Sequence, residues 1–211
     1  MEKKTTIYLI RHGETDANIT RTFQGQSDVP LNENGLHQAE LAAARFGKMH
    51  FDKIFSSDLS RAAVTARKIA GEREIVFTPE LREWHLGKWE GLSFAQAAEK
   101  FPDEMAAYRA GLPDAAVPGG ESRRELHDRA RRIISTLLDD CPGQTLLCVT
   151  HGGLLRAIFK NITGITCPAQ MIRTDNTCFC GFSFSHDSQQ WQMLCWNDTA
   201  HLEKKALDGS W

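Results

Sequence analysis

Two stretches of this chain share one design, a run of apolar residues that ends in histidine followed by glycine. One covers residues 5–13 and the other covers residues 146–152. Apolar runs of this length that end at glycine predict buried strands. Ligands of open α/β sheets bind beyond the carboxyl ends of the strands. If the two strands are neighbours, the imidazoles of His12 and His151 meet in one site.

Arg11, the residue before His12, indicates which chemistry such a site suits. A guanidinium binds an oxyanion through two parallel N–H donors, and an imidazole can attack phosphorus. The same pair is a poor site for a metal cation. The local interpretation is therefore phosphoryl chemistry. The alternative is that His12 is an ordinary strand-end histidine beside a solvated Arg11.

Arg61 adds a second guanidinium from another predicted strand end. Residues 53–56 predict a short strand, and a helix follows through Ala70 with Arg61 in its first turn. Arg67 and Lys68 supply the cations that are expected near the helix C-terminus. At the N-terminus, by contrast, the helix dipole favours anions. A cation in the first turn is mildly unfavourable unless an anion binds there, so Arg61 is a second candidate for a phosphate contact.

Four motifs occur in this chain in one order, at residues 11–14, 56–62, 81–83 and 151–152. In their residues and their order they resemble the histidine phosphatase superfamily, whose fold is shared by the cofactor-dependent phosphoglycerate mutases. The resemblance extends over residues 7–202. Several ordered motifs carry far fewer false positives than a single one.

The resemblance implies a three-layer α/β fold in which a mostly parallel sheet is flanked by helices. We expect a single domain over residues 1–211, with a lid inserted at about residues 92–120. Alternating residues at 179–184 and 191–196 predict a C-terminal hairpin. Residues 16–30 lack sustained periodicity and are expected to form a loop over the strand ends.

The resemblance also implies roles for individual residues. His12 would attack phosphorus, and Glu83 would protonate the leaving group. The other residues implied to bind or stabilise the phosphate are Arg11, Asn18, Gln24, Gly25, Arg61, His151 and Gly152. Two alternatives stay open, namely that Asn18 only closes an Asx-turn and that Glu83 only forms a surface salt bridge to Arg82 or Lys88. No metal or other cofactor is implied.

Composition limits the partners. A net charge of −2 and a pI near 6.4 leave no polybasic surface for nucleic acid or for an anionic membrane. No apolar run reaches the length of a membrane span, and residues 1–4 lead into a predicted strand without the apolar region that is typical of a signal peptide. We therefore expect a cytoplasmic protein whose partner is a small phosphorylated metabolite, with a homodimer left open.

A helix predicted at residues 121–138 is rich in arginine. Its apolar residues recur at helical spacing, so we expect the arginines to form a solvated face. These arginines are Arg123, Arg124, Arg129, Arg131 and Arg132.

The expected activity is metal-independent hydrolysis of phosphomonoesters through a phosphohistidine, and the alternative is a cofactor-dependent phosphoglycerate mutase. A mutase needs a lid that holds a second phosphate. The predicted lid has only Lys100 and Arg109 as basic residues against four acidic ones. It offers little to a second phosphate unless Arg82, Lys88 or Arg123 reaches in. Several substrates are compatible with the sequence, among them α-ribazole phosphate, sugar phosphates, phosphoglycerates and phosphoserine.

Two alternatives come from other classes of protein. One is a module that binds phosphorylated ligands without catalysis, which the presence of both His12 and Glu83 disfavours. The other is a histidine-based metallohydrolase. The chain has no His-Glu-x-x-His motif to support it.

Overall fold

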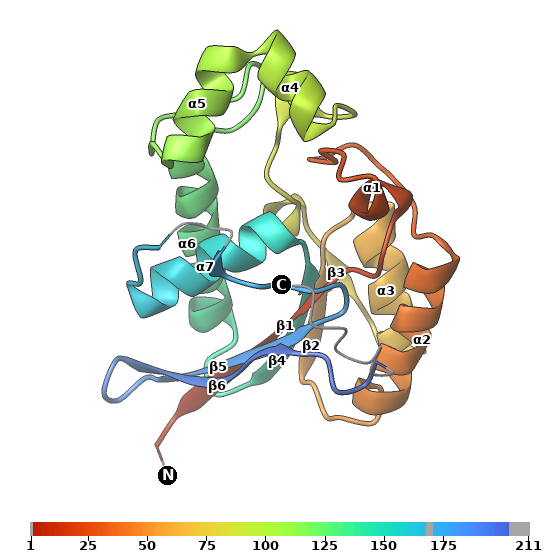
Figure 1. Ribbon diagram of the computed structural model, residues 1–211. Helices are drawn as coiled ribbons and strands as arrows, with labels where there is room; N and C mark the ends of the chain where they lie inside the picture. The colour runs from red at the N-terminus through yellow and green to blue at the C-terminus, as the bar shows by residue number, and fades with distance from the viewer. Residues whose placement is uncertain (1, 168–170, 203–211) are drawn as a thin grey trace.

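A six-stranded sheet forms the centre of the protein in the computed structural model, which describes residues 2–167 and 171–202 (Figure 1). The strands lie in the order β3-β2-β4-β1-β5-β6. They are β1 (Lys4–Arg11), β2 (Lys53–Ser56), β3 (Val76–Phe77), β4 (Thr145–Thr150), β5 (Phe179–Ser185) and β6 (Gln190–Asp198). The first four pair in parallel, whereas β5 and β6 form an antiparallel hairpin at one edge. The expected sheet and C-terminal hairpin are therefore confirmed.

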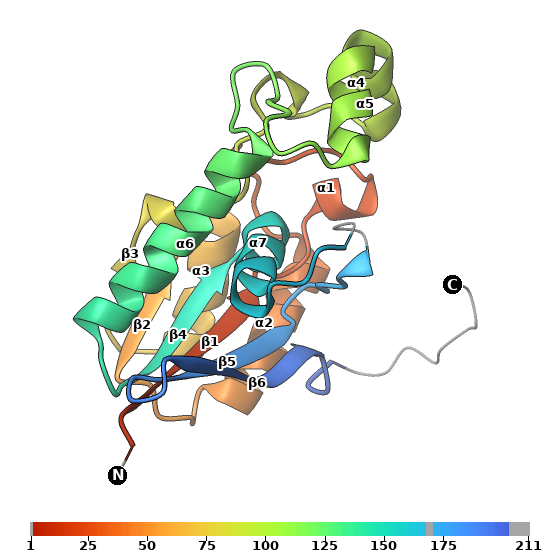
Figure 2. The ribbon, with the colours of Figure 1, turned by 90° about the vertical axis from the view of Figure 1, so that its left-hand side faces the viewer.

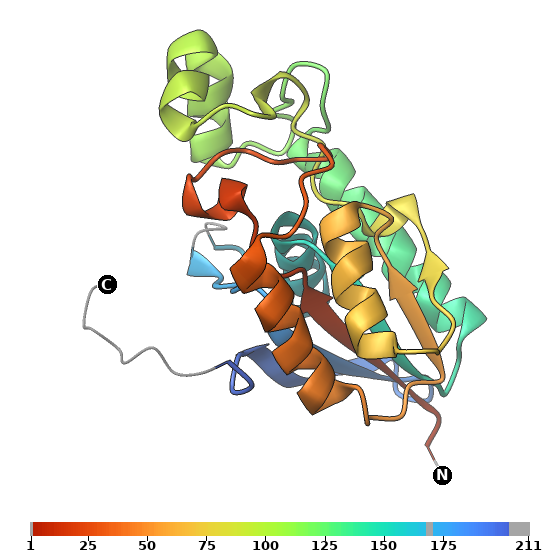
Figure 3. The same ribbon diagram turned by 90° about the vertical axis from the view of Figure 1, so that its right-hand side faces the viewer.

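Helices cover both faces of the sheet, as the three-layer expectation requires. The helices α2 (Glu33–Phe46) and α3 (Ser60–Ala70) lie on one face, and α6 (Arg123–Asp140) and α7 (Gly152–Thr163) lie on the other (Figures 2 and 3). Side chains of a strand point alternately to its two faces. In β4, Leu147 and Val149 accordingly pack with α2 and α3, while Leu146 and Cys148 pack with α6 and α7.

Residues 92–120, which we call the lid segment, contain two helices above the sheet. These are α4 (Phe94–Lys100) and α5 (Pro102–Ala110), and Figure 1 shows them beyond the ends of the parallel strands. Two short 3-10 helices, η1 (Pro79–Leu81) and η2 (Gly87–Trp89), precede them. Both helical pieces of the lid segment agree with the sequence expectation to within one or two residues.

The expectation of an uninterrupted loop at residues 16–30 is wrong in one place. The helix α1 (Asp16–Ile19) lies there, although it has only one turn. The cause is a capping box: the Thr15 side chain accepts from the Asn18 N–H, and the Asn18 side chain accepts from the Thr15 N–H. In the described part of the chain, no helix is long and apolar enough to cross a membrane.

Candidate active site

The register between β1 and β4 brings the two histidines together. Arg11 is paired with Thr150, so the next residue of each strand leaves the sheet at the same point. The His12 N–H donates to the Thr150 carbonyl at 2.9 Å. The rings of His12 and His151 are 5.0 Å apart between centroids, and both are buried. We call Arg11, His12, Arg61 and His151 the catalytic floor.

The hydrogen bond of His12 determines which of its nitrogens can react. Its Nδ1 lies 2.6 Å from the Gly13 carbonyl, which can only accept, so Nδ1 carries the proton. Burial, together with the charges of Arg11 and Arg61, lowers the pKa of His12 well below its ordinary value. The imidazole is therefore neutral near pH 7, and the lone pair of its Nε2 is available to a phosphorus atom.

The other histidine, His151, is held at both ring nitrogens. Arg61 Nε donates to His151 Nδ1 at 3.2 Å, so the proton of the neutral ring lies on Nε2. That Nε2 donates to the hydroxyl of Ser57 at 2.8 Å. Ser57 lies within the second motif but was not predicted as a site residue, and it is completely buried directly after β2. Burial, followed by the charge of Arg61, lowers the pKa of His151 well below its ordinary value.

The Arg61 guanidinium is fully buried and is fixed by backbone oxygens. Its two terminal nitrogens donate to the carbonyls of Gly25 and Ser27, each at 2.7 Å. Burial lowers the pKa of Arg61, while the charge of Glu83 acts in the opposite direction. No carboxylate lies within 4 Å of it among residues 2–167 and 171–202. The group is a buried cation whose position is set before any ligand arrives.

The Arg11 guanidinium is held in place by a hydrogen bond to Thr174, a residue that was not predicted from sequence. Its Nη1 donates to the Thr174 carbonyl at 2.6 Å. Its Nε is buried and has no hydrogen-bond partner in the described structure. The backbone N–H of Gly152, at the start of α7, also has no acceptor among the described residues. Because buried donors in proteins are normally paired, two unpaired donors beside His12 indicate an anion site.

The carboxylate of Glu83 lies at the N-terminus of α7. It accepts from the N–H groups of Gly153 and Leu154 at 3.0 and 3.2 Å, and from that of Trp84 at 2.8 Å. Gly153 permits this approach, because a Cβ at that position would lie 2.3 Å from Glu83 Oε1. Arg82, the partner considered from sequence, pairs with Asp58 instead. The surface salt bridge to Arg82 is therefore excluded for Glu83.

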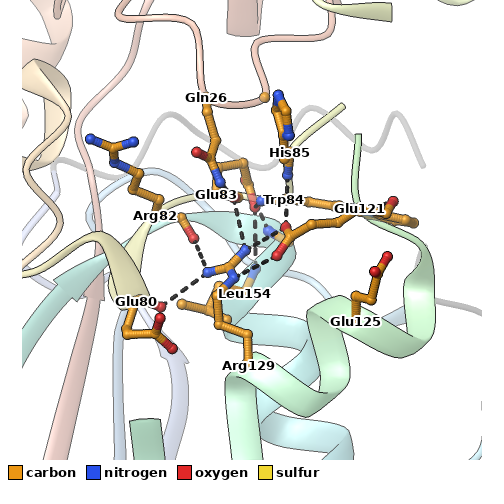
Figure 4. Close-up of polar contacts among 12 residues, drawn as sticks. Gln26, Glu80, Arg82, Glu83, Trp84, His85, Glu121, Glu125, Arg129 and Leu154 are labelled. Atoms are coloured by element: carbon orange, nitrogen blue, oxygen red, sulfur yellow. Dashed lines mark hydrogen bonds and ion pairs between the residues drawn. The ribbon is translucent and has the colours of Figure 1, made fainter. Parts of the chain in front are cut away.

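Arg129 holds the segment that carries Glu83 (Figure 4). Its guanidinium donates to the backbone carbonyls of Glu80, Arg82 and Glu83, and it forms a two-point ion pair with Glu121. Only 6% of the Arg129 side chain is exposed.

The expectation that the arginines of α6 form a solvated face is thus wrong for Arg129, and also for Arg123. Arg123 is half-buried and lies over the rings of Trp84 and Tyr108. The expectation of a solvated face is correct for the three exposed arginines of the helix, Arg124, Arg131 and Arg132. The apolar stripe indicated correctly which face is buried, but it could not show that two guanidiniums have partners at the edge of that face.

The remaining predicted residues, Asn18, Gln24 and Gly25, lie beside the catalytic floor. The Oδ1 of Asn18 accepts from Thr15 and from the amide of Asn176, which leaves its Nδ2 as a donor. Gln24 accepts from the Thr15 hydroxyl, and the carbonyl of Gly25 is used by Arg61. Asn18 Nδ2 and Gln24 Nε2 are therefore side-chain amide donors that have no acceptor among the described residues. In the described chain, no group of three or more His, Cys, Asp or Glu side chains is placed to hold a metal ion.

Comparison with known proteins agrees with this geometry. The family model of the histidine phosphatase superfamily (branch 1) matches residues 7–199. A metal-independent phosphoserine phosphatase of Arabidopsis thaliana is 36% identical, over 94% of this chain and 83% of the relative. A probable phosphoglycerate mutase of Serratia proteamaculans is also 36% identical, over 96% and 97%.

A solved structure shows the same fold. It is a phosphoserine phosphatase mutant of Entamoeba histolytica in complex with phosphoserine, and it has a TM-score of 0.85 at 28% identity. The match covers 94% of this chain and 100% of that one. With the family model matching almost the whole length, the chain belongs to branch 1 of the histidine phosphatase superfamily.

Proposed function

We propose that this protein hydrolyses the phosphate monoesters of small metabolites through a phosphohistidine formed on His12. It is a phosphomonoesterase of the histidine phosphatase superfamily, as the family match and the phosphatase relatives indicate. The observation that carries the proposed mechanism is the hydrogen bond between His12 Nδ1 and the Gly13 carbonyl. This bond leaves His12 Nε2 free beside the charges of Arg11 and Arg61.

In the first step, His12 Nε2 attacks phosphorus, and the bond to the leaving oxygen breaks. The Nδ1–H group stays hydrogen-bonded to the Gly13 carbonyl, and this bond stabilises the positive charge that the ring acquires. Arg11 Nε, the Gly152 N–H and Asn18 Nδ2 are the donors available to the equatorial oxygens. Donors fixed in advance stabilise the transition state without the cost of reorganisation.

Glu83 gives its proton to the departing alkoxide. It then takes a proton from the water that attacks phosphorus, which breaks the bond to His12 and releases inorganic phosphate. The position of Glu83 at the N-terminus of α7, the same helix end that offers the Gly152 N–H, supports this role. No step needs a metal ion, because Arg11 and Arg61 supply the positive charge.

A mutase is the second candidate, and one observation favours it. A probable phosphoglycerate mutase matches this chain at the same identity as a phosphatase does. The two activities differ in the acceptor of the phosphoryl group, which is water for a phosphatase and a second hydroxyl for a mutase.

Acid lability tests the mechanism, because a phosphohistidine is stable in base and labile in acid. Brief incubation with labelled substrate, quenched in base, should label the wild type and not the His12→Ala variant. Label that survives acid, or that persists without His12, contradicts the proposal.

A second assay, in which 3-phosphoglycerate is primed with 2,3-bisphosphoglycerate, separates the two candidates. We expect phosphate release to exceed isomerisation, and the reverse result supports the mutase. Turnover should also survive thorough chelation of divalent metals.

A further inference from the structure

A group of cations without acidic partners lies under the lid segment. Arg123, Arg156 and Lys160 are half-buried, and none of them lies within 4 Å of a carboxylate in the described parts of the chain. Elsewhere, arginines such as Arg45 and Arg82 pair with aspartates. Cations that are withdrawn from water are normally paired, so three that lie together without a carboxylate among them require an explanation.

These three side chains line one cavity, which we call the lid pocket. It has a volume of about 900 Å³ and lies between the end of α5, the start of α6, α7 and residues 164–167. The exposed Arg109 also lines it, and no acidic side chain does so among the described residues. The Nε of Arg123 is buried without a hydrogen-bond partner in the described structure. A donor in this state is a candidate contact for an anion.

The lid pocket adjoins the catalytic floor through Thr174. Arg11 donates to the carbonyl of Thr174, and Arg156 donates to its hydroxyl at 2.8 Å. After burial, the charge of Arg156 is the next cause that lowers the pKa of Arg11, so the two guanidiniums lie near each other. The positive charge of the floor therefore continues into the pocket through Arg156, and Glu83 is the acidic group that lies near both.

The cations of the lid pocket also act on one another. Burial lowers the pKa of Lys160, and the charges of Arg123 and Arg156 lower it further. Like charges that are held together in this way repel, and an anion between them relieves the repulsion. A second anionic group on the substrate is one such anion.

We infer that the lid pocket binds a second anionic group of the substrate, through Arg123, Arg156 and Lys160. This inference rests on the proposed function, and it narrows the substrate class to phosphomonoesters that carry a carboxylate or a second phosphate a few bonds from the ester. Arg156 lies nearest the reacting phosphate, since it shares Thr174 with Arg11.

The cations of the lid pocket change the charge balance that was expected from the sequence of the lid. Counting only residues 92–120 gave a lid with a negative balance. The cations that face the underside of the lid come instead from α6 and α7, and Arg123 does reach in. A second phosphate therefore does find cations to hold it.

Binding to the inactive His12→Ala variant tests the inference without relying on turnover. The probes are 3-phosphoglycerate and glycerol 3-phosphate, which differ in having a carboxylate or a hydroxymethyl group at the distal carbon. Calorimetry should give a dissociation constant about 10- to 100-fold lower for 3-phosphoglycerate, as expected for charge-assisted hydrogen bonds. In a third arm, 2,3-bisphosphoglycerate shows whether a phosphate is preferred to a carboxylate.

Two substitutions, made in the His12→Ala variant, test whether the lid pocket causes the preference for 3-phosphoglycerate over glycerol 3-phosphate. Arg123→Met and Lys160→Met remove the charges and keep the length of the side chains, whereas Arg156 is left intact because it supports Thr174. Together they should reduce the preference for 3-phosphoglycerate to nearly one. The matched control, Arg131→Met, removes an exposed cation that pairs with Asp128 on the same helix, and it should leave the preference unchanged.

Equal affinities for the two esters before any pocket substitution overturn the inference, and so does a preference that survives both pocket substitutions. If the double variant does not fold, Lys160→Met alone decides, because among the described residues the Lys160 ammonium donates to a backbone carbonyl, that of Cys167, and to no side chain. Failure of the proposed function is seen separately, as absence of turnover of p-nitrophenyl phosphate by the wild type.

Discussion

The catalytic floor and the lid pocket are both cationic, but they are built differently. In the floor, His12, Arg61 and His151 are buried, and their mutual and backbone hydrogen bonds fix which atom faces the ligand. In the lid pocket, Arg123 and Lys160 are half-exposed, and within residues 2–167 and 171–202 each donates to a single backbone carbonyl. A rigid site suits a step that must stabilise one transition state, whereas an adaptable site suits recognition of a substituent.

This difference predicts that substitutions in the two sites have different effects on activity. Substitutions in the floor, or in the residues that support it and Glu83, should slow the phosphoryl step whether or not the ester carries a second charge. Substitutions in the pocket should instead change the order in which esters are preferred. The predictions below test the floor side of this comparison, from the largest expected effect to the smallest.

The largest effect is expected from Glu83→Gln, because an amide cannot donate the proton that an alkoxide needs. Loss of a general acid lowers the rate by roughly 10² to 10⁴. The loss should be confined mainly to alkyl phosphates, since aryl phosphates such as p-nitrophenyl phosphate leave without a proton. The measurement is kcat/KM for glycerol 3-phosphate and for p-nitrophenyl phosphate, in the wild type and the variant.

An equal loss on both esters would mean that Glu83 only supports the start of α7, where it accepts from Gly153 and Leu154. The matched control is Glu80→Gln, three residues away. Glu80 has a side chain 40% exposed that pairs with the exposed Arg132. This control should behave like the wild type on both esters.

Arg129→Met should have the next largest effect. The substitution leaves Glu121 half-buried without its partner and frees three backbone carbonyls near Glu83. Breaking a buried pair in this way costs about 3 to 5 kcal/mol of unfolding free energy. If Arg129 also positions Glu83, kcat for alkyl phosphates should fall more than kcat for aryl phosphates.

Urea unfolding and the same pair of esters separate the two effects. The double variant Arg129→Met, Glu121→Leu removes both charges and should recover part of the stability. It should not recover the alkyl rate, because the carbonyls of Arg82 and Glu83 stay without their donor. If the double variant recovers the alkyl rate as well as the unfolding free energy, Arg129 acts through stability alone.

The catalytic floor could be predicted from sequence because each of its residues is the last of a strand, directly follows one, or lies at the start of a helix. The register of β1 with β4 then brings His12 and His151 together, as the two His-Gly stretches indicated. Arg61 was placed by the same logic, from a cation at a helix end where none is favoured. The positions of these residues at strand and helix ends were sufficient to predict that they meet, because their contacts follow from which strands are neighbours.

The lid pocket and the Arg129 support could not be predicted in this way. Arg123, Arg156 and Lys160 come from two helices that have no shared motif, and they converge only because α6 and α7 pack together under the lid segment. Arg129 lies among exposed arginines in the sequence. It differs from them only because Glu121 and the turn after η1 happen to face it. Ser57 and Thr174 were missed for the same reason, since their roles depend on tertiary contacts.

A smaller effect is expected from Ser57→Ala, which removes the hydroxyl that accepts from His151 Nε2. A net hydrogen bond of this kind contributes about 1 to 2 kcal/mol, so kcat/KM should fall about tenfold on alkyl and aryl esters alike. The control is Ser135→Ala on α6, whose side chain is exposed. A fall on one class of ester only would show that the hydroxyl serves the leaving group and not His151.

The last prediction concerns the stability of the floor on acidification. In the folded protein, burial and neighbouring arginines lower the pKa of His12 and His151 below the value of about 6.5 that an unfolded chain has. Below pH 6.5 these two histidines therefore bind protons in the unfolded chain but stay unprotonated in the folded protein. The unfolding free energy is highest above pH 6.5 and falls with acidification, by at most about 1.4 kcal/mol per pH unit for each histidine.

Urea titrations at pH 7.5 and 5.5 measure this slope, in a window where few carboxylates titrate. His12→Gln keeps a neutral side chain of similar size and should flatten the slope by the share of one histidine. His50→Gln changes a histidine whose side chain is 81% exposed, and it should leave the slope as in the wild type. If His12→Gln leaves the slope unchanged, folding does not lower the pKa of His12, which contradicts a buried ring held neutral by the floor. The floor would then be no more preorganised than the lid pocket.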